Sequence, residues 1–484
     1  MLLLLCMLLP LAGGAVLPLL PLKSDRKRAV FVESVVLVTS GLVLFTLIRG
    51  ENSEIRPAEL MRGMTLAFRT DGSGKVFAGL AAFLWPLATL YAFEYMEHEE
   101  RAASFFSWYT MTYGVTLGVA FSANLFTMYI VYECLTFLTL PLVTHRQDAA
   151  SMAAGRKYLV YCMTGAVMGF LSLIAVQAWG TGADFTHGGT LSAEAMDQHG
   201  EMLRILFLAG FFGFGTKAAV FPLHHWLPEA SVAPTPVTAL LHAVAVVNTG
   251  AFAVLRLVND VYGMDFLRGS WAAYAAFGTA CFTIVFAGVR AVKEQHWKRK
   301  LAWSTVSNLS YMLMGICLMT PGGAAAGMTH MVCHSLMKIT LFYCVGAVQV
   351  KTGKEYVQEV RGMGKCMPVT CSVFLFAAAA LVGLPPLCGF TGKFSLMTAA
   401  SEISGWMGVT GISVLILSAV LTALYVFPVA FSFWLRKGET LPTEKRDPSW
   451  RMLLPLGVLC AAILVLGVYA GPLLRFLKDA AAII

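Results

Sequence analysis

Apolar runs long enough to cross a membrane recur from one end of this 484-residue chain to the other. A helix needs about 20 apolar residues to span the roughly 30 Å hydrocarbon core of a bilayer. Hydrophobic residues make up 58% of the chain, charged residues make up 13%, and the mean hydropathy is +0.71. The sequence therefore predicts an all-α membrane protein with about fourteen transmembrane helices in a single polytopic domain, residues 1–484. The predicted spans lie near residues 2–20, 29–48, 76–95, 104–121, 123–143, 157–178, 202–221, 236–258, 270–290, 301–319, 325–349, 368–398, 408–435 and 452–474.

The distribution of basic residues predicts the topology. No basic residue precedes the first apolar run, and its basic cluster, Lys23 to Arg28, follows it. This order favours a retained first helix with its N-terminus outside over a cleaved signal peptide. The cytoplasmic loops then include KSDRKR, HRQDAASMAAGRK, KEQHWKRK, KTGKEYVQEVRGMGK and RKGETLPTEKRDPSWR, and both termini lie outside. We expect these basic residues to be solvated and to set the topology, which accounts for the net charge of +8 without nucleic acid.

Proline and glycine interrupt two of the apolar segments. One interruption is FPLHHWLPEASVAPTPV, just after Lys217, and the other is GLPPLCGFTGK, which ends at Lys393. Proline removes a backbone donor and breaks a helix, and irregular backbone is tolerated at membrane depth only where it packs in protein or lines a wet cavity. By count these are helices seven and twelve, so we predict two inverted five-helix repeats, roughly residues 104–260 and 270–435, with a site at their interface.

The chain carries no motif for redox, nucleotide or metal chemistry. Its eleven cysteines are scattered through apolar segments without a C-x-x-C pair or a Cys/His cluster, so we interpret them as small buried hydrophobes. GFTGK lacks the spacing of a phosphate loop. We expect neither a cofactor nor a metal here, and no catalytic residue. The connections 179–201, outside, and 436–451, inside, are solvated or amphipathic loops, and the second is charged enough to contact a partner.

Several charged residues lie inside the apolar runs. A charge at bilayer depth costs roughly 3 kcal/mol on insertion scales, so intramembrane charges usually serve a function. Lys217 lies in LFLAGFFGFGTKAAVF and Glu133 lies in NLFTMYIVYECLTFLTLPLV. Desolvation favours a neutral lysine and a nearby carboxylate favours a charged one. A change in the distance between Glu133 and Lys217 would therefore switch the proton affinity of the lysine; the alternative is a static buried ion pair.

Histidines extend this set of titratable groups. His330, His334 and Lys338 follow the spacing H-x-x-x-H-x-x-x-K, which places them on one helix face and suits a proton wire. His242 is either part of this wire or a hydrogen-bonded packing residue. Lys393, after the second interruption, is a candidate exit group. The pair His224 and His225 serves either in gating and proton entry or as interfacial residues at the level of the lipid headgroups.

The segments that carry these residues resemble the proton-conducting antiporter-like subunits of respiratory complex I, multisubunit cation/proton antiporters and membrane-bound hydrogenases. The resemblance covers residues from about 70 to 400. The similar segments are GFGTKAAVFPLHHWLPEASVAPTPVTALLHA, NLFTMYIVYECLTF, KRKLAWSTVSNLSYML, GMTHMVCHSLMKITLFYCVGAV and GLPPLCGFTGKF. The resemblance implies that Glu133 and Lys217 form the paired switch, that Lys338 and His334 form the central relay, and that Lys393 lies near the exit. Where some members carry a lysine in helix eight, this chain has His242 and Asn248.

The resemblance also implies an activity and partners. It favours an ion-translocating, most simply proton-translocating, subunit of a multisubunit energy-converting complex of the complex I or membrane-bound hydrogenase type. The partners would be other membrane subunits, including further antiporter-like ones, and peripheral redox subunits, in a prokaryotic inner membrane. A Na+(K+)/H+ antiporter subunit without a redox partner is an alternative, and an idle membrane scaffold is another. The sequence leaves open whether H+ or Na+ moves, in which direction, and with which electron donor.

Overall fold

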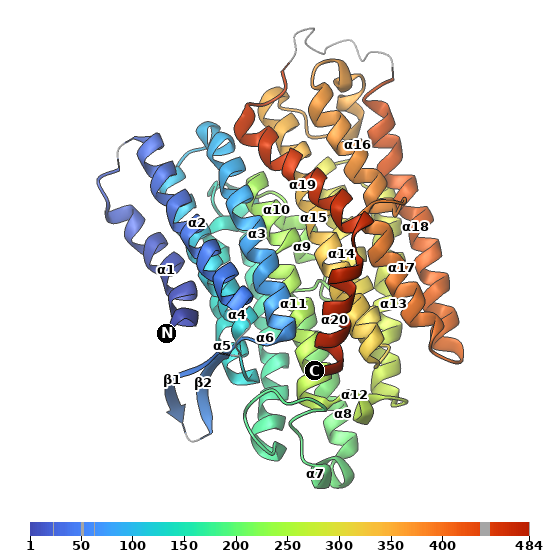
Figure 1. The fold of residues 1–484 in the computed structure, drawn as a ribbon. Helices are drawn as coiled ribbons and strands as arrows, with labels where there is room; N and C mark the ends of the chain where they lie inside the picture. The colour runs from blue at the N-terminus through green and yellow to red at the C-terminus, as the bar shows by residue number, and fades with distance from the viewer. Residues whose placement is uncertain (23, 50–52, 62, 436–445, 484) are drawn as a thin grey trace.

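The computed structural model describes residues 1–22, 24–49, 53–61, 63–435 and 446–483. It forms one bundle of long helices (Figure 1), as an all-α membrane protein should. The helices are α1 (Leu2–Val16), α2 (Asp25–Arg49), α3 (Gly72–Tyr95), α4 (Ala102–Phe121), α5 (Leu125–Val143), α6 (Ala149–Trp179), α7 (Ala193–Gln198), α8 (Gly200–Gly215), α9 (Trp226–Ala230), α10 (Thr235–Ala243), α11 (Val246–Arg256), α12 (Met264–Leu267), α13 (Trp271–Lys293), α14 (Trp297–Ile316), α15 (Pro321–Thr352), α16 (Pro368–Val382), α17 (Cys388–Ser401), α18 (Trp406–Ser432), α19 (Trp450–Val468) and α20 (Gly471–Ile483).

Ten helical segments of the described residues are long and apolar enough to cross a membrane. They contain α1, α2, α3, α5, α6, α10 with α11, α13, α15, α18 and α19. Each remaining predicted span also contains helix: α4 and α14 are richer in hydroxyl, amide or basic side chains, and α8, α16 and α17 are short because their segments are interrupted. The chain is thus a multi-pass membrane protein, while the total of fourteen spans and the internal repeats stay predictions.

A β-hairpin, which the sequence analysis did not predict, fills the second connection. Strand β1 (Glu54–Met61) pairs antiparallel with β2 (Met64–Arg69). The second strand is anchored to the start of α5, because Ala67 N donates to Thr127 Oγ1 (2.9 Å) and Ala123 N donates to Ala67 O (2.9 Å). Arg56 and Arg69 of this connection therefore belong to an ordered element.

Both predicted interruptions are present in the fold. The first runs from the end of α8 at Gly215 to the start of α9 at Trp226, and the second separates α16 from α17 at residues 383–387. A third interruption, between α10 and α11, divides the predicted span 236–258, where Val244 leaves the helical backbone (φ −135°, ψ −61°). The Asn248 side chain donates to the freed Ala243 carbonyl (2.7 Å), which meets the requirement that buried backbone groups be paired.

The long helix α15 runs through the interior of the bundle (Figure 1). Every residue from Gly323 to Val348 is buried. The helix begins after Thr320, whose side chain accepts a hydrogen bond from Gly323 N (3.1 Å), and such a cap satisfies one of the donors left free at a helix start. At its other end, Lys351 forms a salt bridge with the buried Glu94 of α3 (3.1 Å).

Glu94 joins three helices at this end of the bundle. Its carboxylate accepts hydrogen bonds from Lys351 of α15 (3.1 Å) and from the amide (3.0 Å) and hydroxyl of Ser449, the residue that caps α19. A buried carboxylate is costly unless it is paired and hydrogen-bonded, and this one is both. It therefore fixes the ends of α3, α15 and α19 relative to one another.

The expectation that all the basic loops are solvated is wrong at two lysines. Lys298 and Lys300, at the start of α14, are only 3% and 6% exposed. Lys298 Nζ donates to Ala233 O (3.1 Å) and Lys300 Nζ donates to Ala291 O (2.9 Å). Lys300 binds a carbonyl in the last turn of α13, where the final carbonyls of a helix lack partners within the helix. Lys298 binds a carbonyl of the segment between α9 and α10 instead of facing solvent. Residues 436–445 of the charged connection 436–451 lie outside the described part of the chain.

The start of α1 and the end of α20 lie toward the end of the bundle that carries the β-hairpin and α7 (Figure 1). The predicted basic connections after α5, α13 and α15 lie toward the opposite end. This arrangement agrees with termini on one side and basic loops on the other.

Candidate functional site

Lys217 and Glu133 lie close together, but they do not form a salt bridge. Lys217 follows α8 in the first interruption and is fully buried, whereas Glu133 on α5 is half-buried. The two groups interact electrostatically, yet no salt bridge between described residues joins them and neither Glu133 oxygen has a hydrogen-bond partner within the described part of the chain. The Lys217 ammonium instead donates to the main-chain oxygen of Tyr132. The predicted pair is therefore present in an open arrangement.

His242 and His334 meet across the third interruption. His242 is the penultimate residue of α10, and its main-chain oxygen accepts a hydrogen bond from His334 Nε2 on α15 (3.2 Å). Both rings are fully buried. Among the described residues, both ring nitrogens of His242 and Nδ1 of His334 have no partner. Unpaired buried polar atoms are uncommon and mark sites where water or a proton can bind.

Polar side chains of α14 connect Lys338 to His330. Lys338 Nζ donates to Ser304 Oγ (2.6 Å) and to Leu301 O (3.1 Å). One turn further along α14, the Asn308 side chain donates to Ser304 O (2.8 Å), and Asn308 Oδ1 lies 3.2 Å from His330 Nε2. The centroids of the His330 and His334 rings are 6.3 Å apart. Polar atoms of α14 therefore contact Lys338 and His330, two of the three titratable groups predicted to share one face of α15.

Lys393 is held at the second interruption. Its Nζ donates to the main-chain oxygens of Leu381 and Val382 (2.9 Å each), the last carbonyls of α16. The C-terminus of a helix carries partial negative charge and favours a cation there. The ammonium also lies 5.6 Å from the centre of the Tyr311 ring, and the side chain is 7% exposed. Lys393 thus points into the bundle rather than toward lipid.

Helix α17 brings Lys393 against the histidines of α15. A Cβ on Gly392 would lie 2.8 Å from His330 Nδ1, so only glycine allows this close approach. His330 Nδ1 has no hydrogen-bond partner among the described residues. The second interruption and the α15 face are therefore in direct contact.

Helix α11 connects the first interruption to the α15 face. Gly250 packs so closely against the backbone of Lys217 and Ala218 that a Cβ there would overlap it. Two residues earlier, Asn248 donates to Ser335 Oγ (2.7 Å), next to His334 in sequence. Seven of the predicted residues thus form a row that runs from the half-buried Glu133 through the buried Lys217, His242, His334, Lys338 and His330 to Lys393.

The His224–His225 pair stands apart from this row. The His224 ring is buried among Phe221, Phe286 and Trp303, with centroid distances of 5.2 to 5.6 Å. His225 is exposed, and its ring centroid lies 4.5 Å from that of His224. The structure thus brings these two residues to one another and to an aromatic cluster at the edge of the first interruption.

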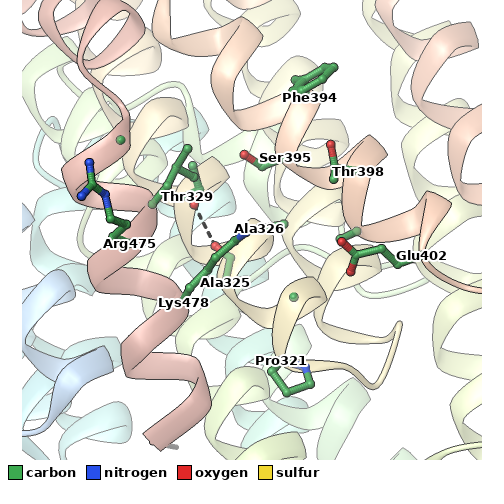
Figure 2. A pocket seen from close by; sticks show the side chains of 14 residues that line it. Pro321, Ala325, Ala326, Thr329, Phe394, Ser395, Thr398, Glu402, Arg475 and Lys478 are labelled. Carbon is green, nitrogen blue, oxygen red and sulfur yellow. Dashed lines mark hydrogen bonds between the residues drawn. The ribbon is translucent and has the colours of Figure 1, made fainter.

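A cavity of about 630 Å³ opens beside the row. It lies between α15, α17 and α20, and Figure 2 shows the Thr329, Ser395 and Thr398 hydroxyls with the charged Glu402, Arg475 and Lys478 around it. Thr329, whose hydroxyl donates to Ala325 O (2.8 Å), directly precedes His330 in the chain. The cavity therefore approaches the row from the end of the bundle where α20 ends.

Sequence reasoning missed several side chains that bind the titratable groups. These are Tyr132, Ser304, Asn308 and Tyr311. A spacing signal existed for Ser304, Asn308 and Tyr311, which follow one another at helical intervals in α14. No comparable signal marks Tyr132, because an aromatic residue in an apolar run is most simply interpreted as packing.

Comparison with known proteins places the chain in a family. Residues 122–444 match the family described as "NADH:quinone oxidoreductase/Mrp antiporter, TM". A probable K(+)/H(+) antiporter subunit from Rhizobium meliloti (strain 1021) is 29% identical over 481 residues, which are 95% of this chain and 46% of that protein. A Na(+)/H(+) antiporter subunit from Staphylococcus aureus (strain JH9) is 27% identical over 443 residues, 84% of this chain and 53% of that protein. The chain spans about half the length of these curated relatives.

Two solved structures share the fold. A chain of the membrane-bound sulfane sulfur reductase, an archaeal respiratory membrane complex, aligns with a TM-score of 0.86 and 22% identity over 99% of this chain and 97% of its own. A chain of the Mrp complex from Dietzia sp. DQ12-45-1b aligns with a TM-score of 0.85 and 22% identity over 99% of this chain and 52% of its own. With the family match over most of its length, this chain belongs to the NADH:quinone oxidoreductase/Mrp antiporter family of membrane subunits.

Proposed function

We propose that this chain translocates protons across a prokaryotic inner membrane as one subunit of a multisubunit energy-converting complex. The observation that carries the proposal is the buried row itself. Five of its members, Lys217, His242, His330, His334 and Lys338, are fully buried, and Lys393 is 7% exposed. Burying so many ionisable groups is costly, and within a membrane such groups usually serve transport.

The roles of the residues follow from their contacts. Glu133 and Lys217 act as the switch at one end, because the lysine is bound to Tyr132 while the carboxylate beside it is free to attract it. His242, His330, His334 and Lys338 act as the central relay, since water can bridge the short gaps between them. Lys393 acts as the exit group, and the cavity at Thr329 would be the route from the row to one face of the bundle.

His224 and His225 are proposed as an entry or gating element rather than as members of the relay. His225 is exposed while its neighbour is buried, so a proton taken up at His225 would be one ring away from the buried part of the first interruption. The inverted repeats, residues 104–260 and 270–435, remain part of this proposal, with the two interruptions as equivalent positions.

The driving partner distinguishes two versions of this function. In the first, peripheral redox subunits drive the transport, as favoured by the full-length likeness to a chain of a respiratory complex. In the second, the complex exchanges Na+ or K+ for H+ without a redox partner, as favoured by the similarity to antiporter subunits from Rhizobium meliloti and Staphylococcus aureus. Both versions place the chain beside other membrane subunits, with its termini on the outer side.

Purification of the intact complex followed by transport assays in vesicles tests the proposal. Iron–sulfur or nickel–iron subunits in the complex would support the redox version, and their absence together with Na+- or K+-dependent proton movement would support the exchange version. A complex that assembles but moves no protons under either driving force would contradict the proposal and favour a scaffold.

A further inference from the structure

Tyr132 makes two separate contacts with the ammonium of Lys217. Its main-chain oxygen accepts a hydrogen bond from Lys217 Nζ, and Lys217 Nζ also lies 3.4 Å from the centre of the Tyr132 ring. A cation over an aromatic face is stabilised by the ring quadrupole, and more strongly when it is desolvated. Both groups are buried, at 1% and 0% exposure. The ring and the carbonyl together form a defined binding position for the ammonium.

The ring of Tyr132 is held in place from behind. Its hydroxyl donates to Phe214 O (2.9 Å), on the last turn of α8, and its ring meets the Phe214 ring edge-on, with centroids 5.3 Å apart and planes at 88°. Lys217, three residues after Phe214, is itself fixed at the backbone by the close approach of Gly250. The side chain of the lysine can therefore move while both the ring and the lysine backbone stay where they are.

Glu133 offers a second position for the same ammonium. It directly follows Tyr132 on α5, and both its oxygens lack a hydrogen-bond partner among the described residues. The acidic or weakly acidic groups that interact with Lys217 are Glu133, Cys134 and Cys162. Since the thiols are weak acceptors, the carboxylate is the position that competes with Tyr132.

We propose that Tyr132 is a positioning residue: its ring and carbonyl hold the ammonium of Lys217 in the open state, from which the lysine moves to Glu133. This inference rests on the proposed transport function. A ring binds a cation without a formal charge of its own, so the lysine is held less tightly than it would be by a second carboxylate. The lysine can then exchange between the two positions, and the open state is stable enough to be populated.

The electrostatic strength of the ring can be varied without changing its shape. Phenylalanine and its mono-, di- and trifluorinated forms, introduced at position 132 of the full chain, weaken the ring quadrupole step by step while the carbonyl is retained. Tyr132→Phe loses the bond to Phe214 O and should keep most of the transport of the intact complex in vesicles. From phenylalanine to the trifluorinated ring, transport should fall stepwise by about tenfold in all, the range of a buried cation–π contact.

Tyr113 provides the matched control. It is also a fully buried tyrosine, on α4, with its ring stacked on Trp85 (4.6 Å) and its hydroxyl bonded to Ser40 (2.9 Å). The same fluorinated series at position 113 should leave transport unchanged. A flat series at position 132, or an equal decline at position 113, would overturn the inference, because a packing role does not depend on the quadrupole of the ring.

One further variant separates this inference from the proposed function. Lys217→Ala should abolish transport whatever Tyr132 does. If Lys217→Ala abolishes transport and the series at position 132 is flat, the transport function stands and the positioning role of Tyr132 is wrong. If Lys217→Ala transports normally, the switch that the proposed function assigns to Lys217 is wrong, and the positioning role of Tyr132 is wrong with it.

Discussion

His334 and His242 are joined through a main-chain oxygen: His334 Nε2 lies 3.2 Å from His242 O, at the point where α10 is interrupted. The contact orients the His334 ring and leaves its Nδ1 without a partner among the described residues. An imidazole with one nitrogen fixed and the other open has a defined tautomer and a defined position for an incoming proton or water. The interruption of α10 thus prepares a central member of the row.

Replacing Lys217 tests the switch directly. Lys217→Ala should reduce proton transport by the complex to background, because the only ammonium beside Glu133 in the described structure is removed. Complex yield should be retained, since alanine leaves no buried charge. Transport in vesicles is the measurement, and Lys157→Ala, which removes an exposed lysine paired with Glu229, is the control expected to behave as wild type. Full transport by Lys217→Ala would rule the switch out.

Replacing Glu133 tests whether the charge of its carboxylate matters. Glu133→Gln keeps the shape and loses the charge, so transport should fall at least tenfold. Glu133→Asp keeps the charge one methylene further from Lys217 and should lose less. Initial rates of proton uptake by vesicles containing each variant provide the comparison. If Gln, Asp and wild type gave the same rates, Glu133 would be a packing residue.

Replacing Lys393 tests the exit group. Lys393→Met keeps the length of the side chain but leaves the Leu381 and Val382 carbonyls without their donor. Transport should be abolished, and some stability should be lost, by about 1–3 kcal/mol for the unpaired carbonyls. Lys393→Arg restores the donor and the charge, so it should recover stability but, as a cation that stays protonated, not transport. An arginine variant that transports normally would show that Lys393 does not release a proton.

Arg256 offers a test of stability that is separate from transport. It is 2% exposed and forms salt bridges with Asp71 (2.6 Å) and Asp260 (2.8 Å), which links α11 to the start of α3. Arg256→Ala leaves two carboxylates unpaired, and breaking a buried pair typically costs about 3–5 kcal/mol. The thermal unfolding temperature should therefore fall clearly. Arg451→Ala, which breaks the half-exposed pair with Glu97, should cost less than about 1 kcal/mol.

His145 predicts a pH dependence of stability. It lies between α5 and α6, and burial lowers the pKa of its ring below the ordinary 6.5. As the pH falls below about 6.5, the unfolded chain takes up a proton that the folded chain rejects, so folding stability falls. His145→Gln removes this contribution, and its unfolding temperature should drop less between about pH 7.5 and pH 5.5 than that of wild type. His187→Gln, at an exposed histidine, should show the wild-type drop.

The sequence predicted those parts of the site that leave a chemical signature. Lysines in apolar runs and prolines within predicted spans are conspicuous because both are costly in a membrane. These residues lie in or next to the interruptions that the structure has at residues 216–225 and 383–387. The spacing of His330, His334 and Lys338 predicted one face because helical periodicity alone decides it.

The parts that were missed lack such a signature. The interruption at Val244 lies in the apolar stretch HAVAVVN, without proline or glycine, and is stabilised by Asn248 from the next turn. The hairpin depends on the pairing of β1 with β2 and on the hydrogen bond between Ala67 and Thr127, which is a tertiary contact. The Lys217 ammonium can bind either of two adjacent residues, Tyr132 or Glu133. Both are visible in the sequence, but the sequence does not show which of them the ammonium binds in the open state.

The hydrogen bonds that join Glu94 to Lys351 and Ser449 have a consequence for how the row can work. Because α3, α15 and α19 are tied together at one end, we expect α15, the helix that carries the proposed relay, to keep its position during transport. Protons would then pass between its titratable groups through rotation of side chains and entry of water, and not through tilting of helices. The rate of such a device is limited by how often water fills the gaps, so it should respond to heavy water and to osmotic stress more than to membrane thickness.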